Sequence, residues 1–219
     1  MRERLGIFGA GGHAKVVADT ALRGDRYEVH AYYDDNVERH GADFYLDRPI
    51  AGGLDALLRD LTDGTLAAAF VAIGHNAARQ RIGATIQDAG HSLATLVDPH
   101  AILSSSVSLG AGTLVVAGAI INADTQLGSH VIVNTGASID HDCLISEAAH
   151  IAPHATLCGG VHVGARSLIG AAATLIPSVR FPSDSILGAG STLVLSREQR
   201  GTYTGQPARL LHSPSSDSN

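Results

Sequence analysis

The sequence is poor in the residues that fill the centre of most globular cores. It has no Trp, four Phe and one Met in 219 residues, and aromatic residues make up 4% of the chain although 45% of its residues are hydrophobic. A core without large rings must be filled by branched aliphatic side chains. This composition favours a thin interior, as in a solenoid, over a thick globular one.

Charged residues are scarce as well. They make up 16% of the chain, and acidic residues outnumber basic ones by 21 to 15, so the formal net charge is -6. Without a run of Lys or Arg, a nucleic-acid partner is disfavoured. Because there is no run of about 18 apolar residues and no basic, apolar leader, we expect a soluble cytoplasmic protein. Cys143 and Cys158 form no CxxC pair, and a reducing compartment suits them.

What the sequence does contain is a six-residue repeat. Every sixth residue from position 97 to 193 is apolar, and two positions before each, from Ala101 to Ser191, stands a small or β-branched residue. A period of six fits neither an α-helix nor an alternating hairpin. It is typical of a parallel β-helix, in which three hexapeptides form one triangular coil of about 18 residues. The apolar residues are Val97, Leu103, Leu109, Val115, Ile121, Leu127, Val133, Ile139, Ile145, Ile151, Leu157, Val163, Ile169, Leu175, Phe181, Leu187 and Leu193.

Gly or Asn follows many of these apolar residues. We expect tight corners there, where a positive φ is often needed. The alternative, an antiparallel sandwich of short strands, would need turns about every 8–12 residues at irregular spacing. The faces between Gly110 and Ile139 carry few charges, which favours self-association into a closed ring. The expected corner residues are Gly110, Asn122, Gly128, Asn134, Gly164, Gly170 and Gly188.

Residues 1–95 are predicted to form a separate small α/β domain. Strands that alternate with helices imply a parallel sheet, whose ligands bind beyond the carboxyl ends of the strands. The strand ends carry Gly9 to His13, Asp34-Asp35 and Gly74 to Asn76, so we expect these loops to meet at one cleft. Strands are expected at 5–8, 27–33 and 66–73, and helices at 14–22, 54–61 and 77–89.

The first of these loops resembles a phosphate-binding turn. Gly9, Gly11 and Ala14 match G-x-G-x-x-[G/A], and Asp34 follows about 20 residues after the helix starts. Glycines there let backbone N–H groups approach a phosphate at a helix N-terminus. Because no second mononucleotide half follows residue 95, we favour a nucleotide-linked or other phosphorylated substrate. NAD binding and a purely structural turn are the alternatives.

Polar side chains near the loop add to this hypothesis. His13 and Lys15 could donate to a pyrophosphate, and Asp34 and Asp35 could accept from a base or a sugar. Arg79, in the last predicted helix, is a weaker candidate, because an arginine on a surface helix is more often solvated.

A histidine between two acids is the strongest catalytic candidate in the repeat. His141 lies in Asp140-His141-Asp142, where a carboxylate could hold the imidazole and raise its basicity, as a general base requires. A solvated acidic turn is the alternative. His150 lies half a coil further on and therefore on the opposite side of the same protomer. We expect both to serve one site only if they come from adjacent protomers.

The column above His141 is nearly free of side chains. Gly159 lies one coil later and Pro177 one coil further, and residues 170–173 keep the neighbouring wall low. A long, thin ligand could therefore lie along this edge with its reactive end at His141.

These motifs together resemble a known superfamily. The hexapeptide array, Asp-His-Asp-Cys at 140–143, His150 and Gly-x-Pro-Ala-Arg at 205–209 resemble the left-handed β-helix acyltransferases. With Phe-Gly-Ala-Gly-Gly-His-Ala-Lys at 8–15, the chain resembles their bacterial sugar-acetylating branch over about residues 4–210. That branch includes the nucleotide-aminosugar N-acetyltransferases of the bacillosamine and perosamine pathways and the sialic acid O-acetyltransferases. The left hand is carried over from the resemblance, since a six-residue period does not set it.

The resemblance implies roles for the catalytic residues. His141 would take a proton from the sugar amine or hydroxyl as it attacks the thioester of acetyl-CoA, Asp142 would orient the imidazole, and His150 would bind near the thioester carbonyl. Members of the family commonly carry Glu where Asp142 stands, so Asp140 could substitute. No acyl-enzyme is needed, because Cys143 is expected to face inward.

The resemblance also implies two binding sites, and the histidine spacing argues against a metal. Gly9, Gly11, Gly12, His13, Asp34, Asp35 and Gly74 would hold the nucleotide or sugar. His150, Gly159, Gly170, Ala171 and Gly188 would contact coenzyme A. Some hexapeptide trimers hydrate carbon dioxide with a histidine-bound zinc, but the expected histidine spacing, a pair five residues apart with a third far upstream, is missing here.

We therefore predict a Rossmann-like domain at 1–95, a left-handed parallel β-helix at 96–196, and a C-terminal extension with a disordered tail at 197–219. The predicted activity is acetyl-CoA-dependent acetylation of a nucleotide-linked 4-amino-4-deoxy sugar, by a homotrimer with sites between subunits. Sialic acid O-acetylation is the alternative, and a zinc hydratase or a noncatalytic scaffold is more distant. One base serves amines and hydroxyls alike, so these residues do not distinguish an amine acceptor from a hydroxyl. They also do not specify the sugar, the nucleotide or the length of the acyl chain.

Overall fold

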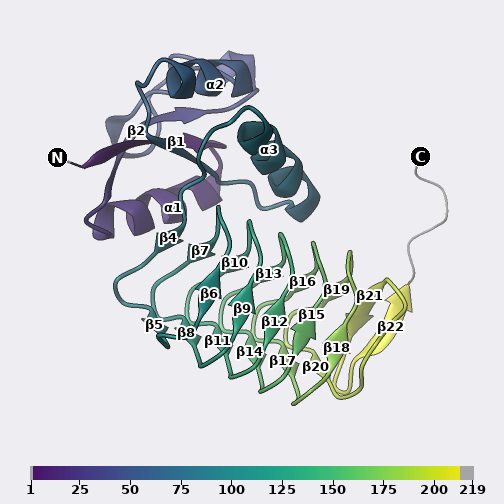
Figure 1. Cartoon of the computed structure of the whole chain (residues 1–219). Coiled ribbons are helices and arrows are strands. Elements are labelled where there is room, and N and C mark those ends of the chain that lie inside the picture. Colours follow the sequence, from purple (N-terminus) through teal and green to yellow (C-terminus); the bar gives the residue numbers. More distant parts are fainter. Residues whose placement is uncertain (1, 213–219) are drawn as a thin grey trace. The chain divides into compact units, whose positions relative to one another are not determined.

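The structure is a computed structural model in which residues 2–212 are described. It divides into two compact units, Met1–Pro99 and His100–Asn219 (Figure 1). The tail predicted to be disordered falls largely at 213–219, outside the described residues. None of the helices within 2–212 has the length and hydropathy of a membrane-spanning segment.

The first unit is built on a three-stranded parallel sheet in the order β2-β1-β3. Figure 1 shows helices on both faces of this sheet, and every residue of β3 is buried. The three strands of this sheet and the three α-helices agree with the sequence-based expectation to within two residues at each end. The elements of residues 2–99 are β1 (Glu3–Phe8), α1 (Gly12–Arg23), β2 (Tyr27–Tyr33), η1 (Val37–Arg39), η2 (Tyr45–Asp47), α2 (Leu54–Thr62), β3 (Ala68–Val71), α3 (Asn76–Asp88) and β4 (Leu96–Val97), of which η1 and η2 were not predicted.

The second unit is the predicted parallel β-helix, and its hand is the left hand that the resemblance implied. Two-residue strands pair with strands one coil later, as Ile132 pairs with His150. They form three sheets, one of which runs β20-β17-β14-β11-β8-β5. The strands are β5 (Ile102–Leu103), β6 (Ser108–Leu109), β7 (Leu114–Val115), β8 (Ile120–Ile121), β9 (Gln126–Leu127), β10 (Ile132–Val133), β11 (Ser138–Ile139), β12 (Leu144–Ile145), β13 (His150–Ile151), β14 (Thr156–Leu157), β15 (His162–Val163), β16 (Leu168–Ile169), β17 (Thr174–Leu175), β18 (Arg180–Phe181), β19 (Ile186–Leu187), β20 (Thr192–Leu193), β21 (Thr202–Thr204) and β22 (Arg209–His212).

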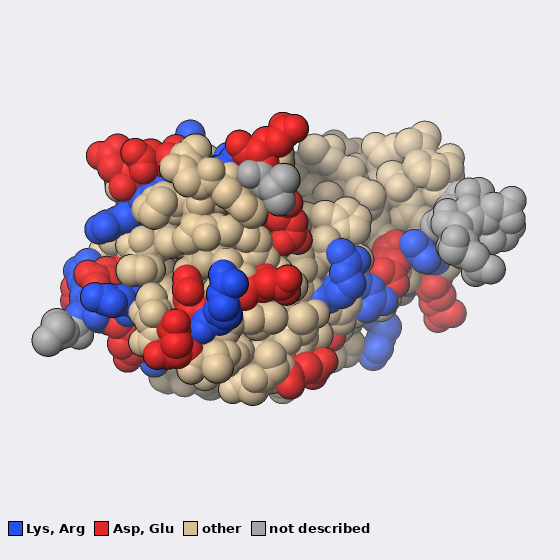
Figure 2. Space-filling view, turned by 90° about the horizontal axis from the view of Figure 1, so that it is seen from above, with Lys and Arg blue, Asp and Glu red and all other residues tan. Residues whose placement is uncertain are grey.

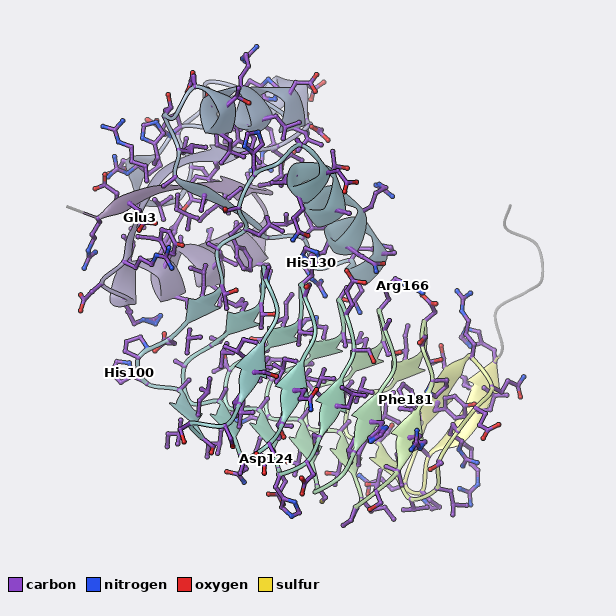
Figure 3. The ribbon with its side chains drawn as sticks, in the orientation of Figure 1. Glu3, His100, Asp124, His130, Arg166 and Phe181 are labelled. Carbon is purple, nitrogen blue, oxygen red and sulfur yellow. The ribbon has the colours of Figure 1, made fainter. Side chains whose placement is uncertain are left out.

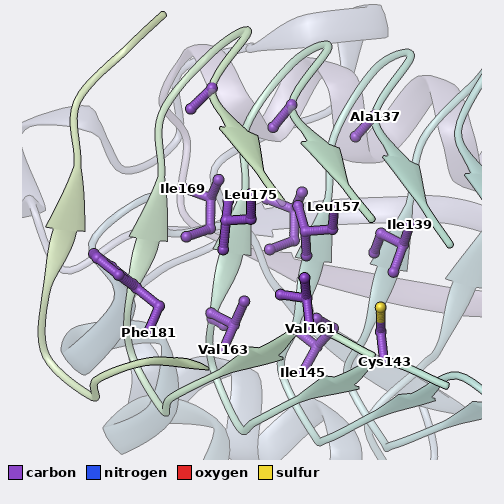
Figure 4. Packing of buried hydrophobic residues seen from close by; sticks show 14 of the residues in the cluster. Ala137, Ile139, Cys143, Ile145, Leu157, Val161, Val163, Ile169, Leu175 and Phe181 are labelled. Carbon is purple, nitrogen blue, oxygen red and sulfur yellow. The ribbon is translucent and has the colours of Figure 1, made fainter. Parts of the chain in front are cut away.

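The repeating apolar residues form the core of the coils. Ile139, Leu157 and Leu175 stack in one column inside the prism, as Figure 4 shows, and each is almost fully buried. Cys143 is 1% exposed and faces inward, as predicted from its place in the small-residue column. In contrast, charged side chains of both signs are scattered over the surface seen in Figure 2, with broad uncharged areas between them.

The corner glycines and asparagines were wrongly predicted to adopt positive φ. The left-handed residue of a corner lies two positions further on, as at Gly112, Asp124 and Asp142. The glycine itself is required by close packing between coils. A Cβ on Gly164 would stand 2.3 Å from the backbone nitrogen of Ser183, one coil above. The chain alone could not reveal this, because the contact exists only once the coils are stacked.

This packing predicts that Gly164→Ala destabilises the coils. The added methyl would push the neighbouring coil away, which we expect to lower the free energy of unfolding by about 1–3 kcal/mol. Ser146→Ala is the matched control, because Ser146 occupies the same column one coil earlier and already carries a Cβ. Thermal and urea unfolding of both variants would measure the difference. Equal stability of the two would contradict the steric explanation.

Candidate functional site

His141 lies at a corner of the β-helix, in the turn between β11 and β12. Asp142, the next residue, has a φ of 58°, which the corner imposes. Figure 3 labels Asp124, which occupies the corner position of Asp142 one coil earlier and so marks this edge. His130 and Arg166, also labelled there, lie along another edge. The corner conformation brings two consecutive side chains together, and His141 Nδ1 lies 2.7 Å from Asp142 Oδ2.

The two acids beside His141 have different tasks. Asp142 accepts the hydrogen bond from the ring, and this contact raises the pKa of His141, with the charge of Asp140 adding to the effect. Asp140 does not bond to the ring. Its carboxylate accepts from the His141 backbone N–H and from the Asn122 amide, each at 2.9 Å. The Asn122 hydrogen bond also lowers the pKa of Asp140, so this acid stays ionised. Its two hydrogen bonds stabilise the backbone conformation of the corner.

The second ring nitrogen of His141 faces a pocket. A Cβ on Gly159 would stand 2.7 Å from His141 Nε2, so only glycine leaves room for the imidazole in this position. With Nδ1 held by Asp142, Nε2 is the nitrogen that can exchange a proton with a ligand. The pocket has a volume of about 440 Å³ and is lined by Asp140, His141, Asp142, Cys158, Gly159, Gly160, Pro177 and Ser178.

His150 lies on a different face of the prism, within β13. Its Nε2 lies 3.2 Å from the amide nitrogen of Asn134. Gly170 and Gly188 follow Asn134 in one column, at intervals of whole coils, and Ala171 is next to Gly170. The residues predicted to contact coenzyme A therefore divide between two edges. One edge carries Gly159 together with His141. The other edge carries His150, Gly170, Ala171 and Gly188.

Asn134 was missed as a site residue and was assigned to a corner. Its position relative to His150 could have been found from the sequence, because the two residues are 16 apart, close to the length of one coil. Asn122 was missed in the same way, since it lies 18 residues before Asp140, which is one coil.

In the first unit, the three strand-end loops come together. The Gly9 N–H donates to Tyr33 O at 2.6 Å, and the Ala10 N–H donates to Asp34 Oδ2 at 3.0 Å. Gly9 has a φ of 104°, and a Cβ there would stand 3.0 Å from Ala72 O. Any other residue at this position would be strained and would separate the loops.

The helix that follows this loop is open at its N-terminus. Gly11 is the N-cap of α1 and makes no side-chain capping bond, and a Cβ on Gly11 or Gly12 would meet no atom within 4 Å. Gly74, in the third loop, is equally open. These three glycines leave backbone groups accessible at the carboxyl edge of the sheet, where an anion would be favoured by the helix dipole.

The two acids of the second loop hold the chain's own backbone. Besides Ala10, Asp34 accepts from the Asn36 N–H at 3.0 Å and lies 3.5 Å from the Arg39 guanidinium. Asp35 accepts from the Leu54 N–H at 2.9 Å, at the start of α2. Sequence reasoning gave both acids to the substrate and did not find Arg39.

The position of Arg79 on a helix had indicated a solvated side chain, and this expectation was wrong. It is fully buried, and its guanidinium donates to Ile73 O at 3.0 Å and to Asn76 Oδ1 at 2.9 Å. Burial lowers the pKa of Arg79 to about 10, so it stays charged at neutral pH. Burial, together with the charge of Arg79, lowers the pKa of His13 to about 4. His13 is therefore a neutral imidazole at pH 7, a hydrogen-bonding group and not a cation.

The histidines of the coils do not gather into a metal site. Within residues 2–212, no three His, Cys, Asp or Glu side chains lie close enough together to hold a metal ion. Both cysteines are free thiols.

Comparisons with known proteins relate both units to sugar acetyltransferases. Residues 4–86 match the family described as the PglD N-terminal domain. PerB from Caulobacter crescentus, solved with CoA and GDP-perosamine, is 39% identical, with 95% of this chain and 97% of PerB covered and a TM-score of 0.87. Two histidine variants of that GDP-perosamine N-acetyltransferase have been solved with the same ligands, and each matches with a TM-score of 0.89.

A second relative is the acetyltransferase domain of PglB from Neisseria gonorrhoeae. It is 34% identical, with 96% of this chain and 100% of the domain covered and a TM-score of 0.88, and it has also been solved with acetyl coenzyme A. A search of the curated proteins found no match.

The geometry at the corner predicts how His141 titrates. Because the hydrogen bond to Asp142 is the larger cause of the raised pKa, Asp142→Asn is expected to lower the pKa of His141 more than Asp140→Asn does. In the Asp142→Asn variant the imidazole would then stay neutral to a lower pH. NMR titration of the histidine ring resonances measures both values. A larger pKa shift in Asp140→Asn would show that Asp140, and not Asp142, is the main cause of the raised pKa of His141.

Proposed function

The chain belongs to the bacterial sugar acetyltransferases that combine a PglD-type N-terminal domain with a hexapeptide β-helix, and we propose that it acetylates the amine of a nucleotide-linked 4-amino-4-deoxy sugar. It is an acyltransferase that uses acetyl-CoA as its donor. The substrate bound to PerB, GDP-perosamine, supports a nucleotide-linked aminosugar as the acceptor.

One observation carries the proposal for the chemistry. His141 is held through Nδ1 by Asp142, and Nε2 faces the pocket over Gly159. In this mechanism Nε2 accepts a proton from the sugar amine as its nitrogen attacks the thioester carbonyl. Asp142 then stabilises the imidazolium that forms. The tetrahedral intermediate collapses to the amide, and the CoA thiolate leaves and takes up a proton. The geometry requires no covalent acyl-enzyme, and Cys143 is buried away from the pocket.

His150 and Asn134 are proposed to bind the thioester carbonyl. They lie within hydrogen-bonding distance of each other on the second edge of the prism. Donors at this position would stabilise the negative charge that develops on the carbonyl oxygen as the amine attacks. Because this edge and the His141 edge are apart within one chain, we propose that a second copy of the chain completes each site, in a homotrimer.

The first unit is proposed to bind the nucleotide-linked part of the acceptor. The open glycines Gly11 and Gly12 at the start of α1 suit the diphosphate, with the neutral His13 as a hydrogen-bonding neighbour. Asp34 and Asp35 would act by shaping the loop, since their carboxylates hold Ala10 and Leu54. We also propose that the reaction takes place in the cytoplasm.

A hydroxyl acceptor such as sialic acid is the alternative. One base at His141 serves a hydroxyl as well as an amine, so the corner does not separate the two chemistries. The likeness to a GDP-perosamine N-acetyltransferase at 39% identity favours the amine.

The test of this function is thiol release from acetyl-CoA with a panel of acceptors. We expect GDP- or UDP-linked 4-amino sugars to be acetylated and free sialic acid to be inert. His141→Ala should lower kcat by about 10²–10⁴-fold, the usual cost of losing a general base. His91→Ala, a histidine change in the loop after α3, is the control. Activity of His141→Ala within threefold of the wild type would refute the role of the base, and acetylation of sialic acid alone would favour the alternative.

Sharing of the site between subunits predicts complementation. His141→Ala and His150→Ala should each be inactive alone, yet a mixed trimer would hold one intact interface of three. Co-expression with two affinity tags, followed by purification on both, isolates the mixed trimers, which should therefore show about a third of the wild-type activity. Each variant mixed with itself is the control. Mixed trimers without activity would contradict a site shared between subunits.

A further inference from the structure

We infer that Thr125 is a positioning residue for the reaction, whose buried hydroxyl fixes the corner that carries His141. This inference rests on the proposed function, because His141 is the base proposed there. Thr125 lies directly before β9 and one coil, 18 residues, before Cys143. Its side chain is fully buried, so it can affect the reaction only through the residues that it holds.

The hydroxyl of Thr125 is bonded to both ends of the corner. Its Oγ1 donates to Asp140 O at 2.7 Å and accepts from the Cys143 N–H at 3.1 Å. A hydroxyl has one donor and two acceptor sites, so a single side chain can make both bonds. Asp140 and Cys143 flank His141 and Asp142. One hydroxyl from the preceding coil therefore closes the turn in which the base lies.

This closure differs from that of other corners, which use a direct backbone bond. In the next corner along the chain, for example, the Ala149 N–H donates to Ser146 O at 3.2 Å. The corresponding atoms at the His141 corner are the Cys143 N–H and Asp140 O, and there the hydroxyl lies between them. Two hydrogen bonds in series span a wider gap than one, so Thr125 sets the width of this turn.

The edge that carries His141 has this hydroxyl at one level only. Thr125 belongs to a column of inward-facing residues one coil apart, two of which, Cys143 and Val161, are labelled in Figure 4. The other corners of the edge form over valine or cysteine, so stacking of the coils does not require a hydroxyl here. The one hydroxyl of the column serves the corner of the base. The column consists of Val107, Thr125, Cys143, Val161 and Val179.

The width of the turn matters because it sets the orientation of the imidazole. The ring is held between Asp142, 2.7 Å from Nδ1, and the space over Gly159, where a Cβ would stand 2.7 Å from Nε2. Loss of the hydroxyl would leave two buried backbone groups without their partner, and the turn would narrow to pair them directly. The peptide groups on both sides of His141 would then rotate, and the ring would move relative to Asp142 and the pocket.

This movement would also change the titration of the base. The charged and titratable groups on this edge near the ring are Asp140, Asp142 and Cys158 in the pocket and Asp124 one coil earlier. The hydrogen bond to Asp142 is the largest cause of the raised pKa of His141. When that bond weakens, the pKa of His141 falls. Because the base acts in its neutral form, the acid limb of the pH profile would move to lower pH.

The experiment compares Thr125→Val, which keeps the shape of the side chain, with Thr125→Ser, which keeps the hydroxyl. We expect Thr125→Val to lower kcat about tenfold at unchanged KM, since a full 1 Å misplacement can cost about 10²-fold. The pKa of His141, measured by NMR and by the pH profile of kcat/KM, should fall in this variant. Thr125→Ser should restore both kcat and the pKa to near their wild-type values.

Thr113→Val is the matched control. Thr113 is equally buried, and its hydroxyl donates to Gly128 O at 3.0 Å in a corner on another edge. We expect this variant to lose thermal stability as Thr125→Val does, because each loses a buried hydrogen bond. Its kcat and the pKa of His141 should stay at the wild-type values.

A purely structural role would give a different result. If Thr125→Val kept the wild-type kcat and the wild-type pKa of His141 while losing stability, the inference would be overturned. Thr125→Cys, which repeats the residue one coil later and is a weak donor, should fall between the serine and valine variants, and it decides by the same criterion if Thr125→Val does not fold. A lowered pKa of His141 in a protein that acetylates no acceptor would refute the proposed function and leave the role of Thr125 standing.

Discussion

The hydrogen-bond ladder between successive coils is the constraint on which the rest of the second unit depends. Each coil donates backbone N–H groups to the coil above, as the Asp140 N–H does to Leu157 O at 2.9 Å. Residues 18 apart are therefore stacked, and each edge of the prism is a column that can be followed in the sequence. This is how Gly159, 18 residues further along the chain, comes to lie against His141. A column of small residues becomes a groove only because the ladder holds the coils in register.

The corner at His141 shows how a rigid repeat orients the side chain that we propose as the base. The backbone is determined by stacking, so the left-handed conformation of Asp142 is maintained by the fold and costs little beyond it. It directs one carboxylate to the imidazole, while Asp140 and Asn122 hold the main chain. The two acids are close in sequence yet act on different atoms. The exposed imidazole is oriented by its neighbours and not by burial.

The two edges are the reason for the proposal that the protein acts in several copies. A prism has no interior cleft, and its core is filled by aliphatic side chains such as Ile139 and Leu157. Any site for a long donor must therefore lie on the surface of the prism, along an edge. A single edge can contact only one side of such a donor. In the proposed trimer a second copy supplies the opposite wall, with His150 and Asn134. In this arrangement oligomerisation is part of the chemistry and not only a means to cover apolar faces.

The sequence by itself determined that the second unit is a β-helix, because a six-residue period specifies the inward column and the coil length, whereas the hand of the coils came from the resemblance. It also determined the choice of His141 and the bare column above it, since both follow from counting in steps of 18. It failed where a contact depends on atoms that approach through space. The demand for glycine at Gly164, the burial of Arg79 and the use of Asp34 by Ala10 were decided only by the tertiary structure. A periodic pattern records which residues face inward, whereas hydrogen-bond partners and steric limits exist only once separate segments have been brought together.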